Sequence, residues 1–161
     1  MELKKEKKYS KVFKFFFHIK LILIFITIVS GALMAGTDAG KSFNTFPLMN
    51  DQFFPDGYYI SEYGWKNYFE NTIAINFNHR WLAMFTFIFI SAIVIYMLNF
   101  NKEKNNNFSL ILILVFLLIQ ILLGILTLIN EVQIVFASLH QINAVLLLAS
   151  IIFAYNRLIY K

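Results

Sequence analysis

Four long apolar segments dominate this chain and decide what it can fold into. They cover residues 13–36, 72–100, 108–130 and 132–155. Each has the roughly 20 residues that a helix needs to cross the hydrocarbon core of a bilayer. With 59% hydrophobic and 14% charged residues, a chain of 161 residues has room for one small membrane bundle. We therefore predict an all-α membrane protein: a four-transmembrane-helix bundle over residues 13–161, preceded by a basic arm over residues 1–12.

Charged residues predict how the bundle is oriented. The basic residues that fall on one side of the predicted membrane are Lys4, Lys5, Lys7, Lys8, Lys11, Lys102, Lys104, Arg157 and Lys161, with Lys14 and Lys20 at the interface. Basic residues remain on the inner side of such membranes. Both termini are thus expected in the cytoplasm of a bacterium or the matrix of a mitochondrion. The net charge of +5 is an orientation signal, and no nucleic-acid partner is expected.

The first apolar segment has a second interpretation. A basic start, an apolar run and small residues near Gly31 and Gly36 also occur in secretory leaders. The apolar run is longer than that of a typical leader. We therefore expect this segment to be retained as a membrane helix.

The segment over residues 37–71 is expected to face the outer side of the membrane. It is acidic, holds both prolines, Pro47 and Pro55, and is rich in aromatic residues. Loops of this length are often functional. We expect it to lie on the membrane surface and cap the bundle, although an interfacial aromatic belt would have a similar composition.

Two histidines lie inside the predicted membrane helices. His79 and His140 are each about seven or eight residues from the outer end of their segment, which is a depth of roughly 10–12 Å. A buried imidazole is costly without a partner, and two at equal depth favour one shared partner, such as a heme iron. The alternative is that each is a hydrogen-bonded structural residue. His18 lies at the opposite interface, where a solvated imidazole is expected, and is assigned no role.

Composition excludes several other kinds of site. The chain has no cysteine, which rules out disulfides, thiolate-bound metals and iron–sulfur clusters. A zinc site needs three or four protein ligands, so two histidines make a weak candidate. The second and third apolar segments hold no carboxylate, so a proton-pumping pathway has little support.

Three local stretches resemble a known family. They are GALMAGTDAGKSFNTFPLMN over residues 31–50, YFENTIAINFNHRWLAM over residues 68–84, and LLGILTLINEVQIVFASLHQINAVLLL over residues 122–148. In order and spacing they resemble heme A synthase, specifically the C-terminal four-helix half of its alphaproteobacterial and mitochondrial form. The resemblance covers roughly residues 22–156. It implies a part in oxidising a ring methyl of heme O to the formyl group of heme A, the cofactor of cytochrome oxidase.

The resemblance also implies roles for individual residues. His79 and His140 match the two axial iron ligands of the family's C-terminal half, which holds a heme b. Arg80 matches a position from which a guanidinium could bind a heme propionate, with interfacial snorkelling as the alternative. The outer-loop motif of the family is matched by Asn44, Phe46, Pro47 and Met49.

Position 76 departs from the pattern of a catalytic half. In the family's N-terminal half a glutamate three residues before the first histidine is held to act in the oxidation, and here that position is Asn76. An asparagine is neither a base nor an anion. Iron with two imidazoles and no open position is suited to electron transfer or structural support. The resemblance therefore predicts an enzyme that works only with a second half.

The prediction from the sequence is thus a heme-b-binding half of heme A synthase in a bacterial inner or mitochondrial inner membrane. Expected partners are heme O as substrate, a missing N-terminal half or a second protomer, heme O synthase and membrane lipid. Two alternatives stay open: a bis-histidine membrane cytochrome for electron transfer, and a non-heme membrane assembly subunit.

Overall fold

The computed structural model describes residues 11–100 and 107–159. Their helices are α1 (Lys11–Gly36), η1 (Ala39–Lys41), η2 (Ser61–Lys66), α2 (Asn67–Glu70), α3 (Thr72–Phe100), α4 (Asn107–Ile129) and α5 (Ile134–Ile159). Four of them, α1, α3, α4 and α5, are long and apolar enough to cross a membrane. The predicted fold class is confirmed, and the chain is an integral multi-pass membrane protein. The basic residues before Lys11, with Lys102, Lys104 and Lys161, lie outside the described residues.

The helix ends follow from local backbone geometry. The last long helix begins at Ile134, whereas the sequence predicted a start at residue 132. Glu131 and Val132 have φ angles of 53° and 60°, in the left-handed region that a right-handed helix cannot contain. The turn between α4 and α5 therefore takes up both residues.

Hydroxyl side chains within the long helices bond to their own backbone. The Oγ1 atoms of Thr27 and Thr127 donate to the carbonyls of Leu23 and Leu123, at 2.8 and 2.7 Å. Lipid offers no hydrogen-bond partner, so a polar group in a spanning helix needs one from the protein. These bonds let threonine occupy otherwise apolar helices.

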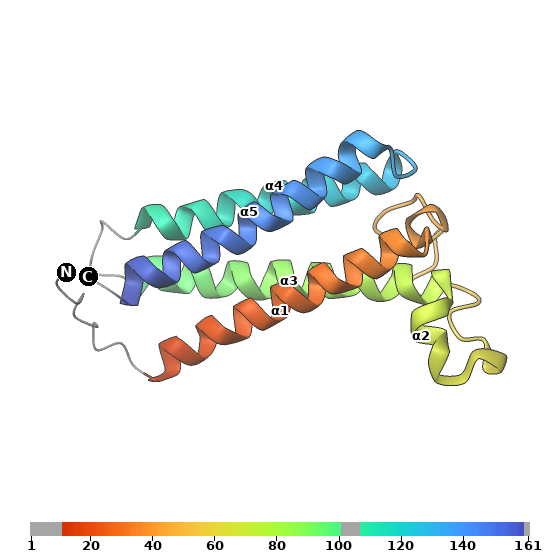
Figure 1. Cartoon of the computed structure of the whole chain (residues 1–161), viewed down its shortest axis with the longest axis horizontal. Helices are drawn as coiled ribbons and strands as arrows, with labels where there is room; N and C mark the ends of the chain where they lie inside the picture. Colours follow the sequence, from red (N-terminus) through yellow and green to blue (C-terminus); the bar gives the residue numbers. More distant parts are fainter. Residues whose placement is uncertain (1–10, 101–106, 160–161) are drawn as a thin grey trace.

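The long helices alternate in direction and form two closely packed pairs (Figure 1). The most extensive contacts join α4 to α5 and α1 to α3, while α3–α4 and α1–α5 contacts complete the bundle. The loop over residues 37–71, with η1, η2 and α2, lies at the end where α1 ends and α3 begins (Figure 1). It is thus a cap on one end of the bundle.

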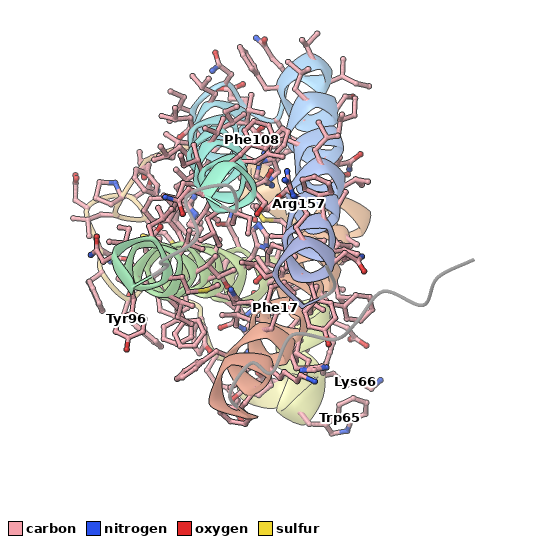
Figure 2. All side chains as sticks on the ribbon, turned by 90° about the vertical axis from the view of Figure 1, so that its left-hand side faces the viewer. Phe17, Trp65, Lys66, Tyr96, Phe108 and Arg157 are labelled. Atoms are coloured by element: carbon pink, nitrogen blue, oxygen red, sulfur yellow. The ribbon has the colours of Figure 1, made fainter. Side chains whose placement is uncertain are left out.

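The apolar core fills the half of the bundle opposite the loop. Its buried members are Phe17, Ile24, Ile90, Val94, Leu110, Ile113, Leu117, Leu147, Ile151, Ala154 and Leu158. Viewed along the bundle from that end, Phe17 points inward and Tyr96 outward (Figure 2), with exposed fractions of 1% and 62%. This packed half fixes the positions of the helices before they reach the loop end.

Lys20, which the sequence placed at the membrane interface, packs beside that core in the structure. It is fully buried, with Nζ 3.6 Å from Sδ of Met97 and 4.6 Å from the ring centroid of Phe17. A cation is attracted to the face of an aromatic ring. This contact compensates part of the cost of burying the ammonium group.

Candidate functional site

His79 lies on α3 against a glycine of the neighbouring helix α1. It is seven residues after Thr72, the first residue of α3. A Cβ atom added to Gly31 would be only 3.1 Å from Cε1 of His79. Glycine therefore allows the close approach of α1 that brings the imidazole against its backbone.

The second helix pair repeats this arrangement. His140 lies on α5, six residues after Ile134, and packs against Gly124 of α4. A Cβ at Gly124 would be 3.0 Å from Cε1 of His140. Each closely packed helix pair thus carries one histidine whose ring rests on a glycine of the partner helix.

A serine holds the first of these rings. Oγ of Ser30 lies 2.8 Å from Nδ1 of His79 and also donates to the carbonyl of Thr27 at 2.8 Å. No described residue bonds Nε2 of His79, and no buried side-chain nitrogen or oxygen in the described part lacks a partner. Nε2 is therefore open to its surroundings, as a ligand nitrogen must be.

A chain of amides holds the second ring. Nε2 of Gln120 lies 3.2 Å from both Nδ1 and Nε2 of His140. Nδ2 of Asn143 donates to Oε1 of Gln120 at 2.6 Å and to the carbonyl of Phe116 at 2.9 Å. This network links α4 to α5 at the level of the histidine.

The two imidazoles belong to one region of the bundle. Each long helix contributes one residue to this region: Gly31 on α1, His79 on α3, Gly124 on α4 and His140 on α5. On each helix the members of the apolar core lie further from the loop than this residue does. The described residues contain no group of three or more His, Cys, Asp or Glu side chains that could hold a metal ion. Two histidines can serve a heme iron, since the porphyrin supplies the other four nitrogens.

Arg80 and Asn76 tie the outer loop to α3. Arg80 is 7% exposed and donates to Oδ1 of Asn76 at 2.6 Å, to the carbonyl of Thr45 at 2.6 Å and to that of Phe43 at 2.7 Å. Nδ2 of Asn76 donates to the carbonyl of Ala39 at 2.7 Å. Arg80 is thus a buried clamp on the loop, and the propionate contact suggested from the sequence stays a prediction. Three of its five N–H groups are used in this way.

Further contacts fix the rest of the loop. Burial raises the pKa of the Tyr58 phenol, the neighbouring Tyr68 adds to the shift, and a hydrogen bond to Asn78 opposes it. The hydroxyl thus stays protonated and donates to Oδ1 of Asn78 at 3.1 Å. Asn71 donates to the carbonyls of Gly57 and Tyr58, at 2.7 and 3.2 Å.

The remaining residues singled out from the sequence lie outside this arrangement or only shape the loop. His18 is exposed near the opposite end of the bundle, 2.7 Å from the carbonyl of Lys14. In the loop motif Met49 is 2% exposed, whereas Phe46 is 37% exposed. Met49 therefore packs inside the cap.

Sequence reasoning did not identify Ser30, Gln120 and Asn143 as partners of the histidines. One signal was available, because strongly polar side chains are rare in membrane helices and usually bond across helix interfaces. Which polar residue faces which histidine depends on how each helix is rotated. The sequence does not show that rotation.

Fold and site together define a four-helix membrane protein with one glycine-supported histidine in each helix pair. The profile of the COX15-CtaA family, described as cytochrome oxidase assembly protein, matches residues 2–152. The chain belongs to this family.

Curated relatives carry one name. Heme A synthase of Bartonella tribocorum is 38% identical over 128 residues, which is 80% of this chain and 36% of the relative. Heme A synthase of Bartonella henselae is 38% identical over 143 residues, or 89% of this chain and 40% of the relative. Heme A synthase COX15 of Arabidopsis thaliana is 34% identical over 127 residues, or 79% and 28%. The chain thus spans well under half the length of these relatives, and the predicted resemblance to heme A synthase is confirmed.

Proposed function

We propose that this chain is the heme-b-binding half of a heme A synthase, with His79 and His140 as axial ligands of one heme iron. The observation that carries the proposal is the repeated arrangement of these histidines. Each ring rests on a glycine of the partner helix, at 3.1 and 3.0 Å, and each is held by a polar side chain of that helix. Both lie between the apolar core and the outer loop.

The donor set fits a heme better than a free metal ion. Imidazole is a common axial ligand of heme iron, and a bound heme would supply a redox-active metal with both axial positions filled. Ser30 orients one ring, and the Gln120–Asn143 pair orients the other. The loop, fastened by Arg80, would limit the access of water from its side of the bundle.

Oxidation of the heme O methyl to a formyl group removes four electrons and needs a site for the substrate. The substrate, heme O, would bind elsewhere in the complete enzyme, because Asn76 of this chain is committed to the loop. Its amide bonds Ala39 and Arg80, and it has no acid–base chemistry to offer. We propose that a missing N-terminal half or a second protomer supplies the carboxylate.

The location and further partners belong to the same proposal. We place the chain in a bacterial inner or mitochondrial inner membrane, with both termini on the cytoplasmic or matrix side. Heme O synthase, which would deliver the substrate, is the proposed neighbour in that membrane. Lipid covers the outer faces of the helices, where many apolar side chains are exposed.

A pyridine-hemochrome spectrum of the purified chain, with its copurifying proteins identified, tests the cofactor. We expect a heme b spectrum and a Soret band, while expression with heme supplied and no Soret band would contradict every heme proposal. Conversion of heme O by the chain alone tests the division of labour. We expect none without a second half, and robust turnover would show that no added carboxylate is needed.

A second candidate function is a bis-histidine cytochrome that only transfers electrons. The asparagine at position 76 favours it, because this chain then needs no catalytic carboxylate. Deletion of the gene distinguishes the two. Loss of heme A supports the synthase, and unchanged heme A with loss of a heme b signal supports the cytochrome.

A further inference from the structure

We propose that Ser30 fixes the proton position of His79 and, through that ring, lowers the reduction potential of the heme. Ser30 is a positioning residue, because it acts on the iron only through the histidine. This inference rests on the proposed heme site and deepens it. It concerns one imidazole and its hydroxyl partner across the interface between α1 and α3.

The Ser30 hydroxyl has two short contacts and only one proton. Its Oγ lies 2.8 Å from the carbonyl oxygen of Thr27 and 2.8 Å from Nδ1 of His79. A carbonyl oxygen can only accept, so the hydroxyl proton is used in the bond to Thr27. The second contact is a hydrogen bond only if the imidazole donates and Oγ accepts. Nδ1 of His79 therefore carries the ring proton.

A neighbouring threonine pair follows the same rule. Oγ1 of Thr27 donates to the carbonyl of Leu23 at 2.8 Å, so it has no proton left for Thr86. The 2.9 Å contact between the two hydroxyls is thus a bond that Thr86 donates and Thr27 accepts. Helix α1 therefore presents two acceptor oxygens to α3, those of Thr27 and Ser30, about one turn apart. Both hydroxyl protons are held by the backbone of α1.

The residue after Ser30 lets the ring come this close. A Cβ atom on Gly31 would be 3.1 Å from Cε1 and 3.7 Å from Nδ1 of His79, so any side chain there would push the ring away from α1. Two adjacent residues thus act together. Gly31 admits the imidazole, and Ser30 fixes its proton.

The proton on Nδ1 leaves the lone pair of the neutral ring on Nε2, which bonds no described residue. A histidine that binds a metal must be neutral, and donation of its other N–H makes it a more basic ligand. Ferric iron carries more charge than ferrous iron and gains more from a stronger ligand. Hydrogen bonds around a heme thereby tune its potential. The bond from His79 to Ser30 should therefore favour the ferric state.

Nitrogen-15 NMR of the heme-free, full-length chain labelled at histidine tests the proton position without a cofactor. The signals of His79 are identified by their loss in His79→Ala. We expect a protonated Nδ1 and an unprotonated Nε2 in the wild type. Ser30→Ala removes the acceptor and should shift the ring toward the Nε2–H form. Ser30→Thr keeps a hydroxyl that can bond the Thr27 carbonyl and should retain the wild-type pattern. A wild-type ring protonated on Nε2 would overturn the inference.

Redox titration of the heme-loaded chain tests the consequence. Ser30→Ala should weaken ferric heme binding about tenfold relative to ferrous binding, the low end for such partners because a hydroxyl is a neutral acceptor. At about 59 mV per tenfold for one electron, the potential should rise by about 59 mV. Ser30→Thr should keep the wild-type potential. An unchanged or lower potential in Ser30→Ala, or an equal rise in Ser30→Thr, would overturn the inference. Where a variant binds no heme, the NMR result decides.

Two matched controls remove hydrogen bonds of similar length away from the ring. Thr86→Val removes the 2.9 Å bond to Thr27 across the same helix interface, and Ser150→Ala removes a 2.7 Å bond within α5. Neither should change the proton position of His79 or the potential. A rise in Thr86→Val equal to that in Ser30→Ala would assign the effect to helix packing and overturn the inference. A wild-type chain with the expected ring proton but no Soret band would overturn the heme site itself.

Discussion

Nε of Arg80 donates a 2.6 Å hydrogen bond to Oδ1 of Asn76, one helical turn earlier on α3. The pair joins the first turns of α3 to three backbone carbonyls of the outer loop, those of Ala39, Phe43 and Thr45. Position 76, for which the resemblance implies a glutamate in a catalytic half, is thus occupied by a residue that anchors the cap. The departure noted in the sequence has a structural purpose in this chain.

Removing the anchor should loosen the loop. Arg80→Leu leaves two loop carbonyls and Asn76 without their donor, and bonds to charged groups contribute about 1.5–3 kcal/mol each. We expect cleavage by a protease added from the loop side to accelerate at least about tenfold between residues 37 and 60. Arg157→Leu, an exposed arginine at the other end, is the control and should leave the cleavage rate unchanged. Equal cleavage of both variants would show that Arg80 does not hold the loop.

Asn76→Ala separates the loop anchor from the charge of Arg80. The substitution keeps the guanidinium and removes the bonds to Ala39 and Arg80. We expect a smaller acceleration of cleavage than in Arg80→Leu, measured by the same protease assay. If Asn76→Ala were cleaved faster than Arg80→Leu, Arg80 would not be the main anchor of the loop.

The two glycines beside the histidines should tolerate no side chain. Gly31→Ala and Gly124→Ala place a methyl group 3.1 and 3.0 Å from the Cε1 atoms of His79 and His140, which must then move. Overpacking of this kind costs about 1–3 kcal/mol. We expect a lower low-spin heme fraction in each variant by absorption spectroscopy. Gly36→Ala is the control, because a Cβ there meets nothing within 4 Å. If Gly36→Ala lowered the low-spin fraction as much as Gly31→Ala and Gly124→Ala do, the loss would come from general helix destabilisation and not from contact with the histidines.

Alanine substitutions of the three histidines should give two different results. His79→Ala and His140→Ala should each lower heme occupancy or convert low-spin iron to high-spin iron, because one of the two proposed ligands is lost. His18→Ala should change neither quantity. Heme content by pyridine hemochrome and spin state by absorption spectroscopy measure these effects, and equal losses in all three variants would contradict the assignment.

The aromatic side chains of η2 and α2 should lie in the membrane interface. Trp65 is 74% exposed and 6.3 Å from Phe69 between ring centroids, at the loop end of the bundle. Tryptophan favours the headgroup level of a bilayer. In a Trp81→Phe variant Trp65 is the remaining tryptophan, and we expect brominated lipids to quench it most when the bromines lie near the headgroups. Fluorescence insensitive to every brominated lipid would place Trp65 in water or against another protein.

The sequence was sufficient for the membrane helices, because segments of more than 20 apolar residues leave few other folds. It also singled out His79 and His140, since imidazoles stand out in such segments, and their role as iron ligands stays a prediction. The sequence did not identify the side chains that contact these two histidines. The helices are apolar on nearly every face, so hydrophobic periodicity does not show which side turns inward, and Ser30 and Gln120 could have faced lipid. The carbonyls that bind Arg80 depend on the path of the loop, which no residue pattern predicts.

The most direct test of the account is electron paramagnetic resonance of the ferric chain, purified and titrated with heme to saturation. The account predicts one heme per chain, with a low-spin bis-imidazole signal that disappears in both His79→Ala and His140→Ala. A heme signal that survives unchanged in both variants, or saturation without any low-spin signal, would contradict the claim that these two histidines hold one iron.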